Sequence, residues 1–210
     1  VLSRHGVDPN RRFLLYVGGL SPHKNLLRLI EAFAVAGLAD ERVSLVLVGD
    51  LGDVFHTHVP ELRNAIDRTG LGDSVHFTGF VPDEELVTFY NRADALVQPS
   101  LMEGFGLPPV EAMACGTPVL CSQAGSLPEV VGDAGLYFDP TDVVAMAKAL
   151  RRIVDDPGLR LILAARAFER AGHYSWPAAA SALLDLFEDV SRAKAGRSRS
   201  VNERVWRRSA

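Results

Sequence analysis

The sequence predicts an α/β fold in which a parallel sheet of about six strands carries helices on both of its faces. Short apolar runs alternate with helical patterns along most of the chain, and several of these runs end in Gly or Asp. Apolar residues make up 48% of the 210 residues, enough for a substantial core. Alternating strands and helices are typical of parallel βαβ units, and the terminal glycines indicate tight turns between strand and helix.

The elements follow from the apolar pattern in chain order. Apolar runs predict buried strands at residues 13–17, 44–48, 75–77, 95–97, 119–121 and 136–138. Apolar residues at helical spacing predict helices at residues 25–38, 58–68, 83–92, 109–115 and 127–131, and beyond the last strand at residues 143–154, 159–171 and 176–193. Ligands of open parallel sheets bind at the carboxyl ends of the strands, so the loops there are where a site is expected.

The chain is expected to have three parts: an interdomain linker remnant at residues 1–12, a domain with C-terminal helices over residues 13–193, and a tail over residues 194–210 that differs in charge. The tail carries six basic residues against Glu203 alone, a net charge of +5 that leaves −9 for the rest of a chain whose total is −4. An acidic globular part argues against a nucleic-acid-binding face. For the tail two interpretations stay open, a disordered segment or an electrostatic contact with anionic lipid.

Cysteine usage and hydropathy favour a cytoplasmic protein. Cys115 and Cys121 lie in apolar stretches and are interpreted as buried thiols in a reducing compartment, with a disulfide or a metal pair as the alternative. No run of about 20 apolar residues is present, and the first eight residues do not resemble a signal peptide. A lipid-binding tail would add peripheral attachment to the inner face of the membrane.

The first candidate loop follows the first predicted strand and contains Gly18, Gly19 and Lys24. Two glycines let backbone amides approach a ligand closely, and the N-terminus of the next helix with a nearby lysine suits an anion. The loop is neither GxxxxGK(S/T) nor GxGxxG. A tight turn with a surface lysine is therefore the alternative interpretation.

The second candidate loop follows the fourth predicted strand and is more informative. It carries Glu103, a Gly-Phe-Gly turn and Pro108-Pro109, which suit the first positions of a helix where no amide donor is needed. Amides between Gly106 and Val110 are expected to face an anion, with the helix dipole behind them. The alternatives are that Glu103 is a solvated loop acid and that Glu111 only complements the helix N-terminus.

Glu103 and Glu111 form an E-x7-E pattern that resembles the signature of the retaining family-four, or group 1, glycosyltransferases. The resemblance runs from about residue 13 to residue 190 through six segments in order: YVGGLSPHKN, LVLVGD, VHFTGFVPDEEL, ADALVQPSLMEGFGLPPVEAMACGTPV, GSLPEVVGDAGLYFDP and YSW. It implies the C-terminal half of a GT-B fold, a Rossmann-like domain that binds a nucleotide-diphosphate sugar.

The resemblance also implies a role for each matching residue. Lys24 would hold the donor diphosphate and Glu103 would contact hydroxyls of the transferred sugar, which makes these two the expected catalytic residues. Glu111 would accept hydrogen bonds from the ribose hydroxyls. The remaining expected contacts are the amides of Gly18 and Gly19 at the diphosphate, the amides of Gly104, Phe105 and Gly106 at the sugar, Leu107 at the phosphates, and Phe80 and Val81 at the base.

Members of this family need no metal, because lysine and helix dipoles neutralise the leaving diphosphate, so neither a metal nor another cofactor is expected. His56 and His58 near Asp53 are interpreted as surface histidines, since they lack the i, i+4 spacing of helical zinc ligands. The sequence departs from the pattern in two ways. Gly19 stands where many members have arginine, and the N-terminal acceptor domain is expected to be missing here, since residues 1–8 resemble only its last residues.

The expected activity is hexose transfer from a nucleotide sugar to a glycan or lipid-linked acceptor, in polysaccharide biosynthesis. The phrase GGLSPHKN is similar to members that use GDP-mannose. Without the acceptor domain the chain should bind donor and transfer poorly or not at all. Other interpretations are a non-catalytic nucleotide-sugar-binding module, one half of a split enzyme, or a nucleotide-sugar epimerase or glucan phosphorylase relative. Intact Glu103 and Glu111 favour the transferase.

Overall fold

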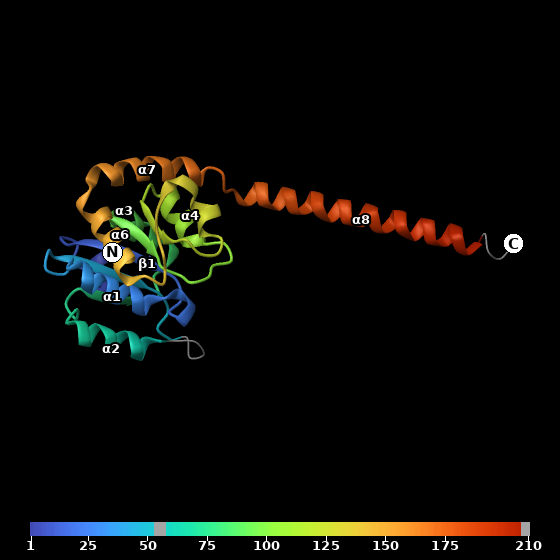
Figure 1. Ribbon diagram of the computed structural model, residues 1–210. Coiled ribbons are helices and arrows are strands. Elements are labelled where there is room, and N and C mark those ends of the chain that lie inside the picture. The colour runs from blue at the N-terminus through green and yellow to red at the C-terminus, as the bar shows by residue number, and fades with distance from the viewer. Residues whose placement is uncertain (53–57, 207–210) are drawn as a thin grey trace. The chain divides into compact units, whose positions relative to one another are not determined.

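A computed structural model describes the backbone of residues 1–52 and 58–206 and the side chains of these residues up to residue 193. Its contacts divide the chain into two units, Val1–Gly172 and His173–Ala210. The first unit contains the sheet and seven of the α-helices in this described part of the chain (Figure 1).

The sheet has six parallel strands in the order β3-β2-β1-β4-β5-β6. Chain order turns outward in both directions from β1 and β4, so the point where the order reverses lies between these two strands. At such a switch point the loops after adjacent strands diverge to opposite faces of the sheet and leave room for a ligand. The strands are β1 (Arg12–Val17), β2 (Val43–Val48), β3 (Val75–Gly79), β4 (Ala95–Gln98), β5 (Val119–Ser122) and β6 (Gly135–Phe138).

Helices cover both faces of the sheet. Leu14 and Tyr16 of β1 join a core with the helices α1, α2 and α6, whereas Phe13 and Leu15 alternate to the other face, where α3 contacts β1 and α4 packs against α7. Figure 1 places α1 and α2 on one side of the sheet and α4 and α7 on the other. The helices are α1 (Leu26–Ala36), α2 (Val59–Thr69), α3 (Asp83–Arg92), α4 (Leu107–Ala114), α5 (Leu127–Val131), α6 (Val143–Asp155) and α7 (Pro157–Ala171), with 3-10 turns η1 (Leu2–His5), η2 (Pro22–Lys24) and η3 (Gly132–Ala134).

The predicted fold class is confirmed, and every predicted strand is present within about two residues of its expected ends. Residues 1–12, expected to be a linker remnant, contact α3 through His5. Leu2 and Val7 are buried, and the His5 imidazole contacts the Glu85 carboxylate at 2.7 Å and the Phe89 ring at 5.6 Å between centroids. The segment therefore belongs to the first compact unit.

The second unit contains α8 (Trp176–Trp206), which extends well beyond the predicted end at residue 193. No proline follows Pro177 in this helix, and the single Gly196 costs only about 1 kcal/mol relative to alanine, so nothing local stops the helix. Most of the basic tail is therefore helical where the structure describes it. No described helix has both the length and the apolar content needed to span a membrane.

Candidate functional site

The loop after β1 is held close to the sheet by its own glycines. Gly18 has φ +147°, and a Cβ atom there would come within 2.9 Å of the Tyr16 hydroxyl oxygen. Tyr16 donates that hydroxyl to the carbonyl of Gly19 at 2.6 Å. Burial, followed by the nearby Glu103 charge, raises the pKa of Tyr16, so its hydroxyl stays protonated and remains a donor.

One expected ligand contact in this loop is corrected. The amide of Gly18 donates to the carbonyl of Val48 at 3.0 Å, which extends the pairing of β1 with β2. An amide committed to the sheet is not a free donor for a diphosphate. The Gly18 amide thus belongs to the sheet, and the expected amide contact falls to Gly19 alone.

Asn25 joins the loop after β1 to the loop after β4. Its side chain is 4% exposed, and its amide nitrogen donates to the carbonyls of Pro99 at 3.0 Å and Pro140 at 2.8 Å. A φ of 62°, which asparagine tolerates better than most residues, aims this side chain inward. A backbone bond from Leu101 to the carbonyl of His23, 2.8 Å long, adds a second connection. Sequence reasoning missed Asn25, whose only local signal is its place between the loop and a helix.

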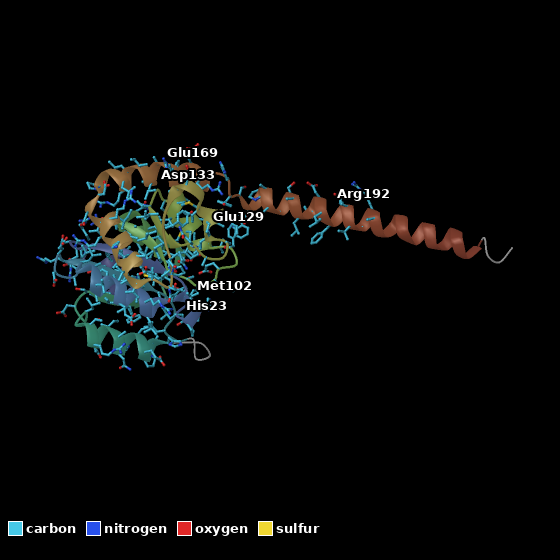
Figure 2. All side chains as sticks on the ribbon, in the orientation of Figure 1. His23, Met102, Glu129, Asp133, Glu169 and Arg192 are labelled. Carbon is cyan, nitrogen blue, oxygen red and sulfur yellow. The ribbon has the colours of Figure 1, made fainter. Side chains whose placement is uncertain are left out.

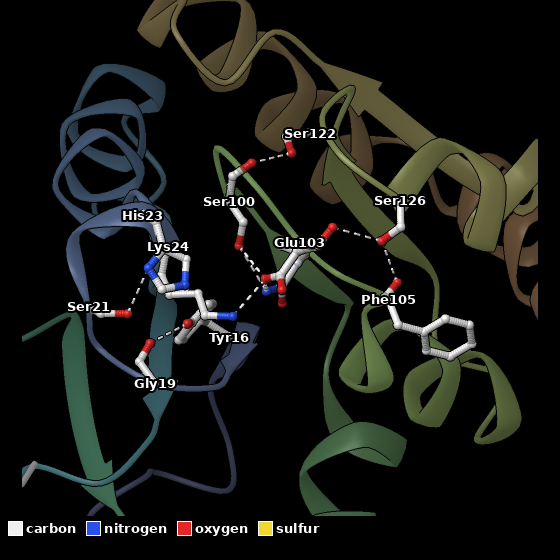
Figure 3. A network of polar contacts seen from close by, with 11 residues as sticks. Tyr16, Gly19, Ser21, His23, Lys24, Ser100, Glu103, Phe105, Ser122 and Ser126 are labelled. Carbon is white, nitrogen blue, oxygen red and sulfur yellow. Dashed lines mark hydrogen bonds and ion pairs between the residues drawn. The ribbon is translucent and has the colours of Figure 1, made fainter. Parts of the chain in front are cut away.

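Lys24 and Glu103 meet where these loops converge (Figure 3). The Lys24 ammonium lies 2.8 Å from Oε1 of Glu103, and the two side chains are only 18% and 11% exposed. Neither alternative interpretation, a surface lysine or a solvated acid, fits this burial. Burial alone would raise the pKa of Glu103, but hydrogen bonds from Lys24 and Ser100 outweigh it and hold the pKa below its ordinary value.

Two further donors bind the same carboxylate. The Gln98 amide nitrogen lies 2.8 Å from Glu103 Oε1, and the Ser100 hydroxyl lies 2.7 Å from it. Gln98 is the last residue of β4 and Ser100 lies two residues beyond it, so the end of the strand itself positions both side chains. Sequence reasoning did not single out either residue, although both lie in the segment that carries the resemblance.

The loop that carries Glu103 is supported from the segment after β5. Ser126 donates its hydroxyl to the carbonyl of Phe105 at 2.9 Å and lies 3.2 Å from that of Glu103 (Figure 3). Gly125 has φ +59°, and a Cβ atom there would come within 2.7 Å of the Glu103 carbonyl. His23 and Met102 lie at the same edge of the first unit (Figure 2). Ser126 and the close approach at Gly125 therefore both constrain the backbone around Glu103.

The helix after this loop, α4, begins at Leu107, two residues earlier than the sequence predicts. Pro108 and Pro109 have no amide hydrogen, and the amide of Val110 already bonds to the carbonyl of Gly106. The expected row of amides from Gly106 to Val110 thus reduces to Gly106 and Leu107. The side chains of Phe105 and Leu107 are 43% and 45% exposed, and Gly104 is also exposed at this end.

Glu111 lies in the first turn and a half of α4, apart from the Lys24 contact. Its Oε2 accepts the Tyr90 hydroxyl of α3 at 2.7 Å, so the carboxylate is more than a partner of the helix dipole. Burial, reinforced by this bond, raises the pKa of Tyr90, and the hydroxyl remains a donor.

Phe80 and Val81, expected together at the base, have different environments after β3. Phe80 is 72% exposed, whereas Val81 is 4% exposed and packs inside. Only Phe80 therefore presents a side chain to a ligand. Asp53 and His56, two members of the possible metal site that was set aside above, lie outside the described residues. Within the described part of the chain, no group of three or more His, Cys, Asp or Glu residues is arranged to hold a metal ion.

Comparison with known proteins finds sequence similarity over most of the chain. A family model described as glycosyl transferases group 1 matches residues 3–170. The chain is 40% identical over 168 residues to an O-antigen chain mannosyltransferase B of Escherichia coli, covering 78% of this chain and 42% of that protein. It is 34% identical over 192 residues to a D-inositol 3-phosphate glycosyltransferase of Corynebacterium efficiens, covering 90% and 45%. The chain thus spans less than half the length of these relatives.

Several solved structures also resemble this chain in fold. Sucrose-phosphate synthase from Thermosynechococcus elongatus superimposes with a TM-score of 0.79 at 31% identity, over 91% of this chain and 48% of that chain. Anabaena HepE in complex with UDP-glucose has a TM-score of 0.69 at 30% identity, over 78% and 44%. The C-terminal domain of a group 1 glycosyl transferase from Francisella tularensis has a TM-score of 0.68 at 27% identity, over 77% and 85%. The six-stranded sheet is that of a GT-B C-terminal domain, and the chain belongs to the group 1 glycosyltransferases.

Proposed function

We propose that this chain is the donor-binding domain of a retaining glycosyltransferase that uses a nucleotide-diphosphate sugar. The observation that carries the proposal is the Lys24–Glu103 contact of 2.8 Å at the carboxyl ends of β1 and β4. These strands flank the switch point of the sheet, where open α/β sheets bind ligands. A cation and a carboxylate held together there match the two ends of a donor, an anionic diphosphate and a sugar rich in hydroxyls.

Lys24 is assigned to the diphosphate. An ammonium group has three N–H donors, and the contact with Glu103 uses one of them, so Lys24 can bind the phosphates without leaving the carboxylate. The N-terminal dipole of α4 and the amides of Gly106 and Leu107 add positive potential on the other side. Together these groups would neutralise the charge that builds on the leaving diphosphate, and we therefore propose a reaction that needs no metal.

The remaining proposed contacts with the donor are assigned to groups near the site that are exposed. Glu111 would bind the ribose hydroxyls through the oxygen that does not accept from Tyr90. Phe80 would stack on the base, and the amides of Gly19, Gly104 and Phe105 would contact the diphosphate and sugar. GDP-mannose is the proposed donor. The support for it is the GGLSPHKN phrase and the mannosyltransferases of Escherichia coli among the relatives.

The acceptor is assigned to a separate domain that precedes this one in the whole enzyme. The chain matches 42–46% of several relatives' lengths, so more than half of each of these relatives lies outside the matched region. We propose a glycan or lipid-linked acceptor and a cytoplasmic enzyme, with the basic end of α8 contacting anionic lipid at the inner face of the membrane. Isolated, the chain would bind donor and transfer little or none.

Calorimetric titration of the isolated chain with GDP, GDP-mannose, UDP and UDP-glucose in the presence of EDTA tests this proposal. The guanine compounds should bind most tightly, and a ligand at about 100 times its Kd should stabilise the fold by about 2.7 kcal/mol. Binding of a uracil compound in preference would change the base but keep the function. If none of the four compounds binds, or if binding needs a divalent metal, the proposed function is wrong.

A further inference from the structure

The two oxygens of Glu103 have different surroundings. Oε1 accepts from Lys24 at 2.8 Å, from Gln98 at 2.8 Å and from Ser100 at 2.7 Å. Oε2 has no hydrogen-bond partner among the described residues. Three donors saturate one oxygen, and two of them, Gln98 and Ser100, come from a single strand end. The carboxylate is therefore held at one oxygen, and no described residue supplies a partner for the other.

The orientation in which Gln98 donates to Glu103 leaves another polar atom of Gln98 without a hydrogen bond among the described residues. Its side chain is 1% exposed, and its amide nitrogen lies near both Ser100 and Glu103. Its own Oε1 is buried without a hydrogen-bond partner within the described part of the chain. Turning the amide over would place that oxygen against the Glu103 carboxylate, two acceptors facing each other. A buried acceptor left unpaired is uncommon in folded proteins and calls for a reason beyond packing.

We propose that Gln98 and Ser100 are positioning residues that hold Glu103 Oε1 and thereby commit Oε2 to the hydroxyl groups of the donor sugar. The inference rests on the proposed function and deepens it. Both residues are buried, Gln98 at 1% and Ser100 at 0% exposure, so they would act through Glu103 and not by contacting the nucleotide. Their loss should therefore affect the part of the binding free energy that comes from the sugar and leave the part from the nucleoside diphosphate intact.

The test compares two ligands on the isolated chain. Kd is measured by calorimetry for GDP and for GDP-mannose with the wild type, Gln98→Leu and Ser100→Ala. In Gln98→Leu the affinity for GDP-mannose relative to GDP should fall about tenfold, the equivalent of one charge-assisted hydrogen bond. Ser100→Ala should lower the same ratio by a smaller factor, because Lys24 and Gln98 still hold the oxygen. Kd for GDP should stay within about twofold in both variants.

Thr117→Val is the matched control. It removes a buried hydroxyl that donates to the carbonyl of Tyr90 at 2.8 Å, a neutral bond that does not involve Glu103. It should lower Tm and leave the ratio of the two affinities unchanged. If Gln98→Leu does not fold, Ser100→Ala still decides the question, because it deletes one small group.

The outcomes separate the two proposals. If wild-type chain binds neither GDP nor GDP-mannose, nor the uracil pair, both proposals are wrong. If it binds them and the variants keep the wild-type ratio, only the positioning role is wrong and the proposed function stands. Loss of both ligands in parallel, together with a lower Tm, would make Gln98 and Ser100 structural residues and would also overturn the inference.

Discussion

Glu103 and Glu111 belong to one motif, but their surroundings differ. Glu103 is 11% exposed and is held at one oxygen by donors from the loop after β1 and from the end of β4. Glu111 is exposed on α4 and accepts one hydroxyl, that of Tyr90, from the neighbouring helix. Two carboxylates eight positions apart in the sequence are thus fixed by different means.

The difference fits the separate roles proposed for the two carboxylates. A carboxylate with one saturated oxygen and a constrained backbone keeps its geometry, which suits contact with the sugar whose bond breaks. An exposed carboxylate with a single partner can adjust to a ligand, which suits the binding of ribose. Lys24 belongs to the Glu103 region, so changes there should affect turnover, whereas changes around Glu111 should affect affinity.

Lys24→Ala should have the largest effect. In the proposed two-domain enzyme, kcat should fall about 10²–10³-fold, because charge builds on the diphosphate as the glycosidic bond breaks. Steady-state kinetics at saturating donor measure it. Lys148→Ala, which removes an exposed lysine of α6, is the control and should behave as the wild type. A rise in KM with kcat unchanged would mean that Lys24, like Glu111, only binds the ligand. That result would contradict the proposed difference between the two regions.

Glu111→Gln should come next. A carboxylate that binds ribose hydroxyls forms charge-assisted bonds of about 1.5–3 kcal/mol, so Kd for the nucleoside diphosphate should rise about ten- to a hundredfold. Tyr90→Phe should weaken binding less, since the carboxylate keeps its charge. Glu129→Gln, on the exposed side of α5, is the control. Calorimetry that finds equal Kd values for Glu111→Gln and the control would remove Glu111 from the ribose contact.

The smallest effect concerns stability in acid. The pKa of Glu103 lies below its ordinary value in the folded protein, so its ionised form stabilises the fold. That contribution is present above the unfolded pKa of about 4.3 and is lost as pH falls through the lower folded pKa. Glu103→Gln should therefore lose less free energy of unfolding than the wild type between pH 6 and pH 3. Urea unfolding at several pH values measures it, with Glu129→Gln as baseline; identical slopes would contradict the ion pair with Lys24.

The sequence alone determined the order and kind of the elements, and it named candidate site residues. Strand and helix periodicities are local, so the six strands and the helices after them follow from neighbouring residues, as at β1 and α3. Lys24, Glu103 and Glu111 could be proposed because each lies in a short continuous motif, and their roles stay predictions. The two prolines at 108 and 109 predicted a helix start for the same reason, and the start was missed by only two residues.

Only the tertiary structure decided which groups remain available to a ligand. The amide of Gly18 is used by Val48, and Val81 turns into the core while Phe80 stays out. Asn25 binds the carbonyl of Pro140, 115 residues away. Each of these outcomes depends on a partner that is remote in sequence and brought near by the parallel sheet. Hydrogen-bond satisfaction and burial are properties of the whole packed chain, so no local pattern specifies that the three donors to Glu103 all bind the same oxygen.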